Sequence, residues 1–206
     1  MGKFLTEQEN FWAGEFGNEY IQRNMSKKLL ASNINFFSKA LNNISVIENC
    51  IEFGANIGMN LKALNYLYPE LDNFAIEINK KAIIDLEKVI PKKNIFNQSI
   101  LNFKPDTKWD LVLIKGVLIH INPNQLDIVY DKLFESTSKY LLVCEYYNPT
   151  PISLDYRGNK DKLFKRDFAG EILKKFGDFD LLDYGFSYHK DNNFPQDDLT
   201  WFLLRK

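Results

Sequence analysis

A glycine-bearing turn and an acidic residue are spaced for binding a nucleoside. Segment 52–58 (EFGANIG) follows a short apolar run, and its glycines let the backbone pass close to a ligand before a helix begins. Glu77 ends the next apolar run, 19 residues after Gly58, where a carboxylate can accept both hydroxyls of an adenosine ribose. A dinucleotide fingerprint would need glycine at the positions of Asn56 and Met59, and no Gly-Lys-Ser/Thr triplet of a phosphate-binding loop follows. The pattern indicates a nucleoside-like ligand and disfavours a nicotinamide-dependent dehydrogenase or epimerase.

Three residues are candidates for moving a proton in a reaction. His120 and His189 are the two histidines of the chain, and Glu145 begins the polar end of a strand-like run. A well-placed acid or base contributes about 10² to 10⁴ to a rate. Each residue also has a structural interpretation: His120 can pack or cap a helix, Glu145 can be buried structure, and His189 can be an exposed loop residue.

Basic residues cluster in segment 148–166, among them Arg157, Lys162, Lys165 and Arg166. Guanidinium and ammonium groups bind carboxylates and phosphates, but the same residues also fit a solvated charge cluster. The segment contains proline and glycine, so we expect a mobile lid beside the site.

Composition limits the class of protein. The 206 residues, 45% hydrophobic and 26% charged, suit one folded unit, and the net charge of −1 attracts no nucleic acid. No apolar stretch reaches the roughly 20 residues of a membrane helix, no metal site is predicted, and the first six residues match a loose myristoylation pattern that recurs by chance. Cys50 and Cys144 lie in apolar runs typical of buried free thiols. We expect a cytoplasmic protein without a nucleic-acid or membrane partner.

From residue 46 onward, short β-rich runs alternate with segments of helical period, which is the pattern of an α/β sheet. The runs predict strands over 50–53, 74–78, 95–98, 111–114, 140–144, 181–184 and 200–204. Residues 111–114 form the continuous apolar run of a central parallel strand. The last two strands have no helix between them, so they can pair only as antiparallel neighbours, after five parallel strands.

Two stretches stand outside this pattern. Residues 1–45 carry Trp12, Phe16 and Tyr20 at a spacing of four, which fits a packed helix face as well as a ligand contact. The other stretch is the insertion 148–166. We expect both to form lids over the carboxyl edge of the sheet, where ligands of open α/β sheets bind.

Several blocks resemble known families. Segment 52–58, Glu77 and the C-terminal strand pair resemble the Rossmann-like methyltransferases that use S-adenosyl-L-methionine (SAM), over residues 46–206. Nearly the whole chain resembles, more narrowly, the methyltransferases associated with pseudaminic acid biosynthesis, through the blocks Phe11–Asn24, Gly116–Pro123, Glu145–Pro151 and Tyr156–Gly170. Asn56 stands where methyltransferases most often have glycine, and asparagine tolerates positive φ.

The resemblance implies an α/β fold with a seven-stranded Rossmann-like sheet, parallel except for a C-terminal antiparallel strand. Residues 1–45 would form a helical lid, and this lid and the methyltransferase domain, residues 46–206, would form a single structural unit. It also implies an enzyme that uses SAM to methylate O or N of a small molecule, such as a nonulosonic acid or its nucleotide-linked form, in bacterial cell-surface glycan synthesis. A non-catalytic SAM-binding module and a tRNA or protein methyltransferase remain alternatives, and the oligomeric state stays open.

The resemblance also assigns the residues of the site. Glu52, Gly54, Asn56 and Gly58 would surround the methionine moiety of the cofactor, and Glu77 would bind its ribose. The remaining cofactor contacts would be Tyr20, Arg23, Asn24, Ile78, Ser99, Ile100, Lys115 and Gly116. Tyr146, Tyr147, Arg157 and Lys165 would contact the acceptor, with His120, Glu145 or His189 as the base.

Overall fold

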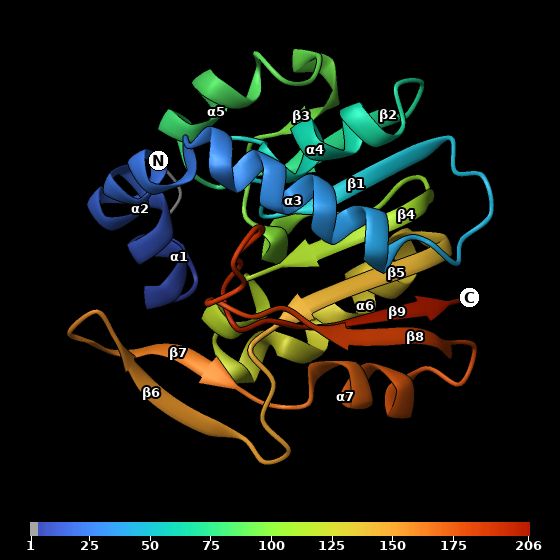
Figure 1. Cartoon of the computed structure of the whole chain (residues 1–206). Helices are drawn as coiled ribbons and strands as arrows, with labels where there is room; N and C mark the ends of the chain where they lie inside the picture. Colours follow the sequence, from blue (N-terminus) through green and yellow to red (C-terminus); the bar gives the residue numbers. More distant parts are fainter. Residues whose placement is uncertain (1–3) are drawn as a thin grey trace.

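A seven-stranded sheet forms the centre of the molecule, and the computed structural model describes residues 4–206 (Figure 1). The strands are β1 (Asn49–Phe53), β2 (Asp72–Ile76), β3 (Ile95–Phe96), β4 (Trp109–Lys115), β5 (Thr137–Glu145), β8 (Asp180–Phe186) and β9 (Thr200–Arg205). Their order across the sheet is β3-β2-β1-β4-β5-β9-β8. Residues 1–3, which belong to the expected lid and to the myristoylation pattern, lie outside the described residues.

The strand directions confirm the predicted topology. Strands β1 to β5 pair in parallel, and β9 runs antiparallel to both of its neighbours, β5 and β8. The chain passes from β8 to β9 without a crossover helix, and a parallel pair would require one. β4 is central, and its residues 111–114 are fully buried. Cys50 and Cys144 are buried free thiols, as predicted.

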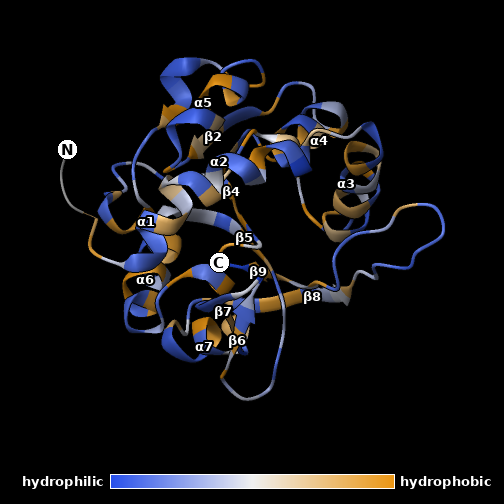
Figure 2. Ribbon diagram, turned by 90° about the vertical axis from the view of Figure 1, so that its left-hand side faces the viewer, coloured by the Kyte–Doolittle hydropathy of each residue, from blue (hydrophilic) through white to orange (hydrophobic). Residues whose placement is uncertain are grey.

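Helices cover both faces of the sheet. They are α3 (Lys27–Ala40), α4 (Met59–Leu67) and α5 (Lys80–Leu86) on one face, and α6 (Leu126–Ser136) and α7 (Phe168–Lys175) on the other. Successive residues of β4 point to opposite faces, so Leu111 and Leu113 pack with the first group while Val112 and Ile114 pack with the second. Hydrophobic and hydrophilic residues alternate along these helices (Figure 2), and their buried residues pack with those of the strands. Every helix among the described residues is too short or too polar to span a bilayer.

Two elements outside the main sheet cover its carboxyl edge. They are a cap formed by α1 (Glu7–Ala13), α2 (Glu15–Tyr20) and η1 (Ile21–Asn24), and a β-hairpin formed by β6 (Ile152–Tyr156) and β7 (Asn159–Lys165). Both lie on the side toward which β4 and β5 point (Figure 1). The insertion 148–166 therefore contains regular strands, which its proline and glycine residues did not predict. The lid expected over residues 1–45 is shorter, because α3 packs on the sheet.

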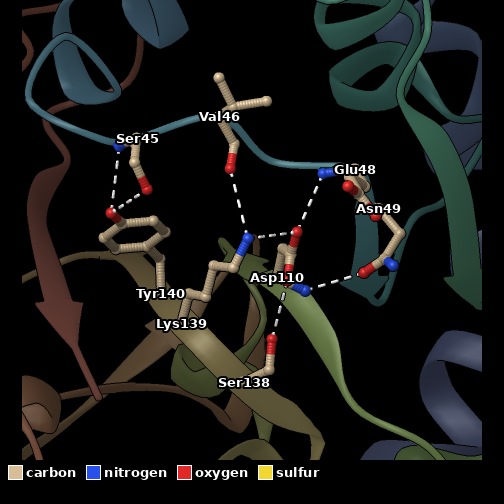
Figure 3. A network of polar contacts seen from close by, with 8 residues as sticks. All are labelled: Ser45, Val46, Glu48, Asn49, Asp110, Ser138, Lys139 and Tyr140. Atoms are coloured by element: carbon tan, nitrogen blue, oxygen red, sulfur yellow. Dashed lines mark hydrogen bonds and ion pairs between the residues drawn. The ribbon is translucent and has the colours of Figure 1, made fainter.

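A polar network around Asp110 ties together the opposite edge of the sheet (Figure 3). The Asp110 carboxylate accepts hydrogen bonds from Glu48 N (3.0 Å), Ser138 Oγ (3.0 Å) and Lys139 Nζ (2.9 Å). Burial acts to raise the pKa of Asp110, but these hydrogen bonds hold that pKa below its ordinary value. Asp110 N also donates to Asn49 Oδ1 (2.8 Å). The network joins the starts of β1, β4 and β5, so it sets their register away from the carboxyl edge.

Candidate functional site

A cavity of about 580 Å³ opens at the carboxyl ends of β1, β2, β4 and β5. This is the ligand-binding edge of open α/β sheets, and the volume is in the range of small-molecule sites. The predicted site residues that line it are Tyr20, Arg23, Asn24, Gly54, Asn56, Glu77, Ile78, Ser99, Ile100, Lys115, Gly116, His120, Tyr146, Arg157 and His189. The predicted residues that lie outside its wall are Glu52, Gly58, Glu145, Tyr147 and Lys165.

The turn after β1 adopts the left-handed backbone conformation that its residues allow. φ is +80° at Gly54, +50° at Asn56 and +79° at Gly58. A Cβ on Gly54 would lie 2.7 Å from Val117 Cγ2, so the turn can approach the segment after β4 only because residue 54 has no side chain. A Cβ on Gly58 would meet Leu86 Cδ1 at 2.7 Å. Gly58 therefore permits helix packing behind the turn and does not contact the cavity.

The Glu77 carboxylate points toward this turn. Its Oε2 accepts a hydrogen bond from Asn56 N (2.7 Å), and its Oε1 accepts one from Asn79 N (2.6 Å). The side chain is buried, which raises the pKa of Glu77, while the backbone hydrogen bonds partly oppose the rise. Each carboxylate oxygen has two acceptor positions, so these bonds leave part of the acceptor capacity of Glu77 for a ligand.

Glu52 was predicted to contact the ligand directly, but it lies outside the cavity wall. The side chain is fully buried, and its Oε1 accepts a hydrogen bond from Asn60 Nδ2 (2.6 Å). Asn60 itself lines the cavity. Burial raises the pKa of Glu52 to about 8, although the Asn60 bond and the nearby Lys115 lower it. Glu52 therefore reaches the cavity only through Asn60.

The cap brings aromatic rings and one arginine to the cavity. Trp12 and Tyr20 line the wall, with ring centroids 5.2 Å apart, and the Arg23 guanidinium lies 5.8 Å from the Tyr20 ring. Asn79 Nδ2 donates to Trp12 O (3.0 Å), so the residue that caps α5 also anchors α1. Burial raises the pKa of Tyr20 to about 12, which keeps the phenol neutral. The aromatic residues spaced four apart, Trp12, Phe16 and Tyr20, thus pack together, and Trp12 and Tyr20 also line the cavity.

His120 lies in an aromatic surround, in the short helix η4 (Leu118–His120) after β4. Its Nδ1 is 2.6 Å from Lys162 O in the hairpin. The rings of Trp12 and Tyr156 lie 4.6 Å and 4.7 Å from the imidazole centroid. Burial lowers the pKa of His120 to about 4, and the Lys162 hydrogen bond only partly opposes this. The imidazole is therefore neutral at neutral pH.

Glu145 was predicted to face the acceptor, and the structure shows it capping η4 instead. Its Oε1 accepts hydrogen bonds from Val117 N and Leu118 N, both 2.9 Å long. The side chain is 3% exposed and lies outside the cavity wall. Burial raises the pKa of Glu145 to about 7 against these bonds. The sequence cannot show whether a glutamate at the end of a strand is catalytic or caps a helix, because the amides that donate to Glu145 follow a different strand, β4.

Three other predicted residues lie at or beyond the mouth of the cavity. His189 lines it and its Nδ1 lies 2.9 Å from Asp198 in the same loop. Lys165 is outside the wall, with its ammonium 5.1 Å from the ring of the lining residue Tyr146. Tyr147 is 42% exposed and packs beside Phe202 on the sheet, with centroids 6.1 Å apart. Direct acceptor contacts from Lys165 and Tyr147 are therefore not supported by their positions.

Several lining residues were not assigned to the site from the sequence, among them Trp12, Asn60, Tyr156 and Asp197. Trp12 and Tyr156 belong to blocks that carried the resemblance, so aromatic residues in those blocks were a usable signal. Asp197 had no such signal. It follows Gln196, a buried residue of the β8–β9 loop whose Nε2 donates to Asn33 Oδ1 (2.8 Å). This long-range contact helps to hold the loop at the cavity.

No protein-family model and no curated protein matches the sequence. A SAM-dependent methyltransferase of Leishmania major has a TM-score of 0.73 at 13% identity, over 96% of this chain and 81% of that one. The magnesium protoporphyrin IX methyltransferase of Synechocystis, solved with SAM, has a TM-score of 0.67 at 12% identity, over 100% of both chains.

A plantazolicin methyltransferase, solved with S-adenosylhomocysteine (SAH), gives a TM-score of 0.65 at 14% identity, over 97% of this chain and 93% of that one. Identities this low establish the fold alone. The chain has the Rossmann-like α/β fold of the class I SAM-dependent methyltransferases.

Proposed function

We propose that this chain is a SAM-dependent methyltransferase that acts on an oxygen or nitrogen atom of a small molecule. The observation that carries the proposal is the Glu77 carboxylate, which is aimed at the Gly54–Gly58 turn and has free acceptor positions at the cavity. Two adjacent ribose hydroxyls can donate to such a carboxylate, as in other Rossmann-like sheets.

The other lining residues fit the remaining parts of the cofactor. The adenine would lie between Ile78 and the Ser99–Ile100 segment, and the Lys115 and Gly116 carbonyls would accept from the methionyl ammonium. Arg23, in the cap, would bind the carboxylate. When bound, SAM supplies a methyl group on a sulfonium sulfur, which leaves as a neutral thioether with the electron pair of the broken bond.

The chain then has to place the acceptor atom in line with that methyl group. Placement of this kind supplies up to about 7 to 11 kcal/mol. A lone pair of the acceptor forms the new bond to carbon, and an acceptor hydroxyl or amine loses its proton during the reaction. Two of the predicted bases, His120 and His189, line the cavity, and His189 Nδ1 lies 2.9 Å from Asp198. His120 is neutral at neutral pH, so its free nitrogen can accept this proton. Glu145 is engaged by backbone amides.

We further propose a nonulosonic acid of the pseudaminic type, its nucleotide-linked form or a related precursor as the acceptor, in the bacterial cytoplasm where a cell-surface glycan is assembled. Two observations support it. Four sequence blocks resemble the pseudaminic acid-associated family, and Arg157 of the hairpin lines the cavity, where it can bind a carboxylate or phosphate. The neighbouring plantazolicin methyltransferase is similar in fold only.

The test has two stages. Calorimetry should show binding of SAM and SAH to the purified chain, and failure of both to bind would refute the cofactor assignment. The chain is then incubated with labelled SAM and a panel of pathway sugars, followed by mass spectrometry. A methylated sugar with stoichiometric SAH supports the enzyme, whereas SAM binding without turnover on any sugar supports a binding module. Methylation only of tRNA or protein would replace the small-molecule acceptor.

A further inference from the structure

The β6–β7 hairpin reaches the interior of the cavity through its backbone. Lys162 O, in β7, lies 2.6 Å from His120 Nδ1. A carbonyl oxygen can only accept a hydrogen bond, so the proton of this bond resides on Nδ1. In a neutral imidazole only one nitrogen carries a proton, which leaves a lone pair on Nε2.

The imidazole of His120 is buried between two aromatic rings. His120 is 7% exposed, and among residues 4–206 no hydrogen bond occupies its Nε2. The Trp12 and Tyr156 rings pack against the imidazole, and their own centroids are 6.3 Å apart. One ring comes from the cap and the other from the hairpin, so the imidazole is enclosed by the two elements that lie outside the main sheet.

The hairpin strand that carries the carbonyl is itself held in place. Gln8 Nε2, in α1, donates to Asp161 O (3.0 Å), the carbonyl next to that of Lys162, and Gln8 is buried. The Lys162 ammonium pairs with Glu7 (3.2 Å). The cap therefore fixes the position of the carbonyl, and the carbonyl fixes the ring of His120.

We infer that the hairpin is a positioning element of the reaction: the Lys162 carbonyl holds the Nδ1–H tautomer of His120 and thereby presents Nε2 to the proton of the acceptor. Lys162 acts through its main chain and is a positioning residue. This inference rests on the proposed function, because it concerns the base of that reaction. It implies that the acceptor atom carries a proton, as in a hydroxyl or amine, since a carboxylate acceptor would leave Nε2 without a role.

The test reads the protonated nitrogen directly by ¹H–¹⁵N correlation spectra of chain labelled with ¹⁵N-histidine. The chain has two histidines, so the His189→Gln variant assigns both sets of signals. We expect His120 to carry its proton wholly on Nδ1 at neutral pH. A proton on Nε2, or an even mixture of tautomers, overturns the inference. The spectrum needs no acceptor, so this failure is distinct from failure of the chain to bind SAM.

Variants separate the carbonyl from the side chains around it. Lys162→Ala and Tyr156→Ala keep the carbonyl and should leave the protonated nitrogen unchanged. Replacing residues 153–164 by an Asn-Gly turn is feasible because Ile152 and Lys165 are cross-strand partners. In that variant we expect His120 to lose the exclusive Nδ1–H signal. An unchanged signal in the shortened chain would overturn the inference, and if that variant fails to fold, the wild-type spectrum still decides.

Discussion

Replacing Glu77 with glutamine tests the cofactor site most directly, because it removes a charge and keeps the size of the side chain. In the wild type, Asn56 N and Asn79 N donate to separate carboxylate oxygens at 2.7 Å and 2.6 Å. A glutamine can accept from only one of these donors, because its NH₂ group then faces the other. The variant should therefore lose some stability as well as the charge that a ribose would use.

The loss of affinity can be worked out from the two hydroxyls of a ribose. A hydrogen bond to a charged group contributes about 1.5–3 kcal/mol, and a neutral one about 0.5–1.5 kcal/mol. Loss of the charge therefore costs about 2–3 kcal/mol over two bonds. At about 1.4 kcal/mol per factor of ten, the affinity for SAM should fall roughly 30- to 150-fold. Calorimetric titration measures the affinity for SAM. A mildly alkaline pH is used so that Glu77 is ionised, because burial raises the pKa of Glu77.

Glu145→Gln is the matched control for Glu77→Gln. It makes the same chemical change at another buried carboxylate that accepts backbone amides, but outside the cavity wall. Both variants should be less stable than the wild type, and only Glu77→Gln should lose SAM. The assignment of Glu77 to the cofactor is wrong if Glu77→Gln binds SAM within about threefold of the wild type, or if Glu145→Gln loses as much affinity for SAM.

Three further substitutions test stability. Gly54→Ala should cost about 1–3 kcal/mol in urea unfolding, because φ is +80° and the new Cβ would lie 2.7 Å from Val117 Cγ2. Asp110→Ala should cost about 1.5–3 kcal/mol and leave SAM affinity unchanged, because its network lies at the opposite edge of the sheet. Glu52→Gln should flatten the pH dependence of stability. The pKa of Glu52 rises from 4.5 to about 8 on folding, so the native chain keeps a proton that the unfolded chain has lost, and wild-type stability falls as pH rises through this range. The low pKa of His120 has the opposite effect only below its ordinary value of 6.5, so the comparison is clearest between pH 6.5 and 8.

Specific outcomes would contradict each of these three predictions. A Gly54→Ala chain as stable as the wild type would show that the turn has room for a side chain. Weaker SAM binding in Asp110→Ala would mean that the network also shapes the cavity. An unchanged slope of unfolding free energy against pH in Glu52→Gln would show that Glu52 is ionised in the native chain.

Much of the fold follows from local patterns in the sequence. Each predicted strand is present, because buried parallel strands need continuous apolar runs such as residues 111–114. Asn79 caps α5 by a local contact, since its side chain satisfies amides two and three residues away. Asn56 takes a positive φ for a reason contained in its own short polar side chain. The acidic residue after β2 and the turn after β1 meet because adjacent parallel strands end at one edge.

The tertiary structure decided which polar residues face the cavity. Glu145 and Glu77 both follow apolar strand runs, yet Glu145 satisfies the amides that begin η4 while Glu77 keeps positions free at the cavity. The hairpin and its contact with His120 join residues 42 positions apart, and Gln8 reaches Asp161 across 153 positions. Local periodicity and capping depend on neighbours within a few residues, so the sequence determined the elements and their edge. The donors that compete for a carboxylate or an imidazole come from distant segments, and only the packed chain brings them within hydrogen-bonding distance.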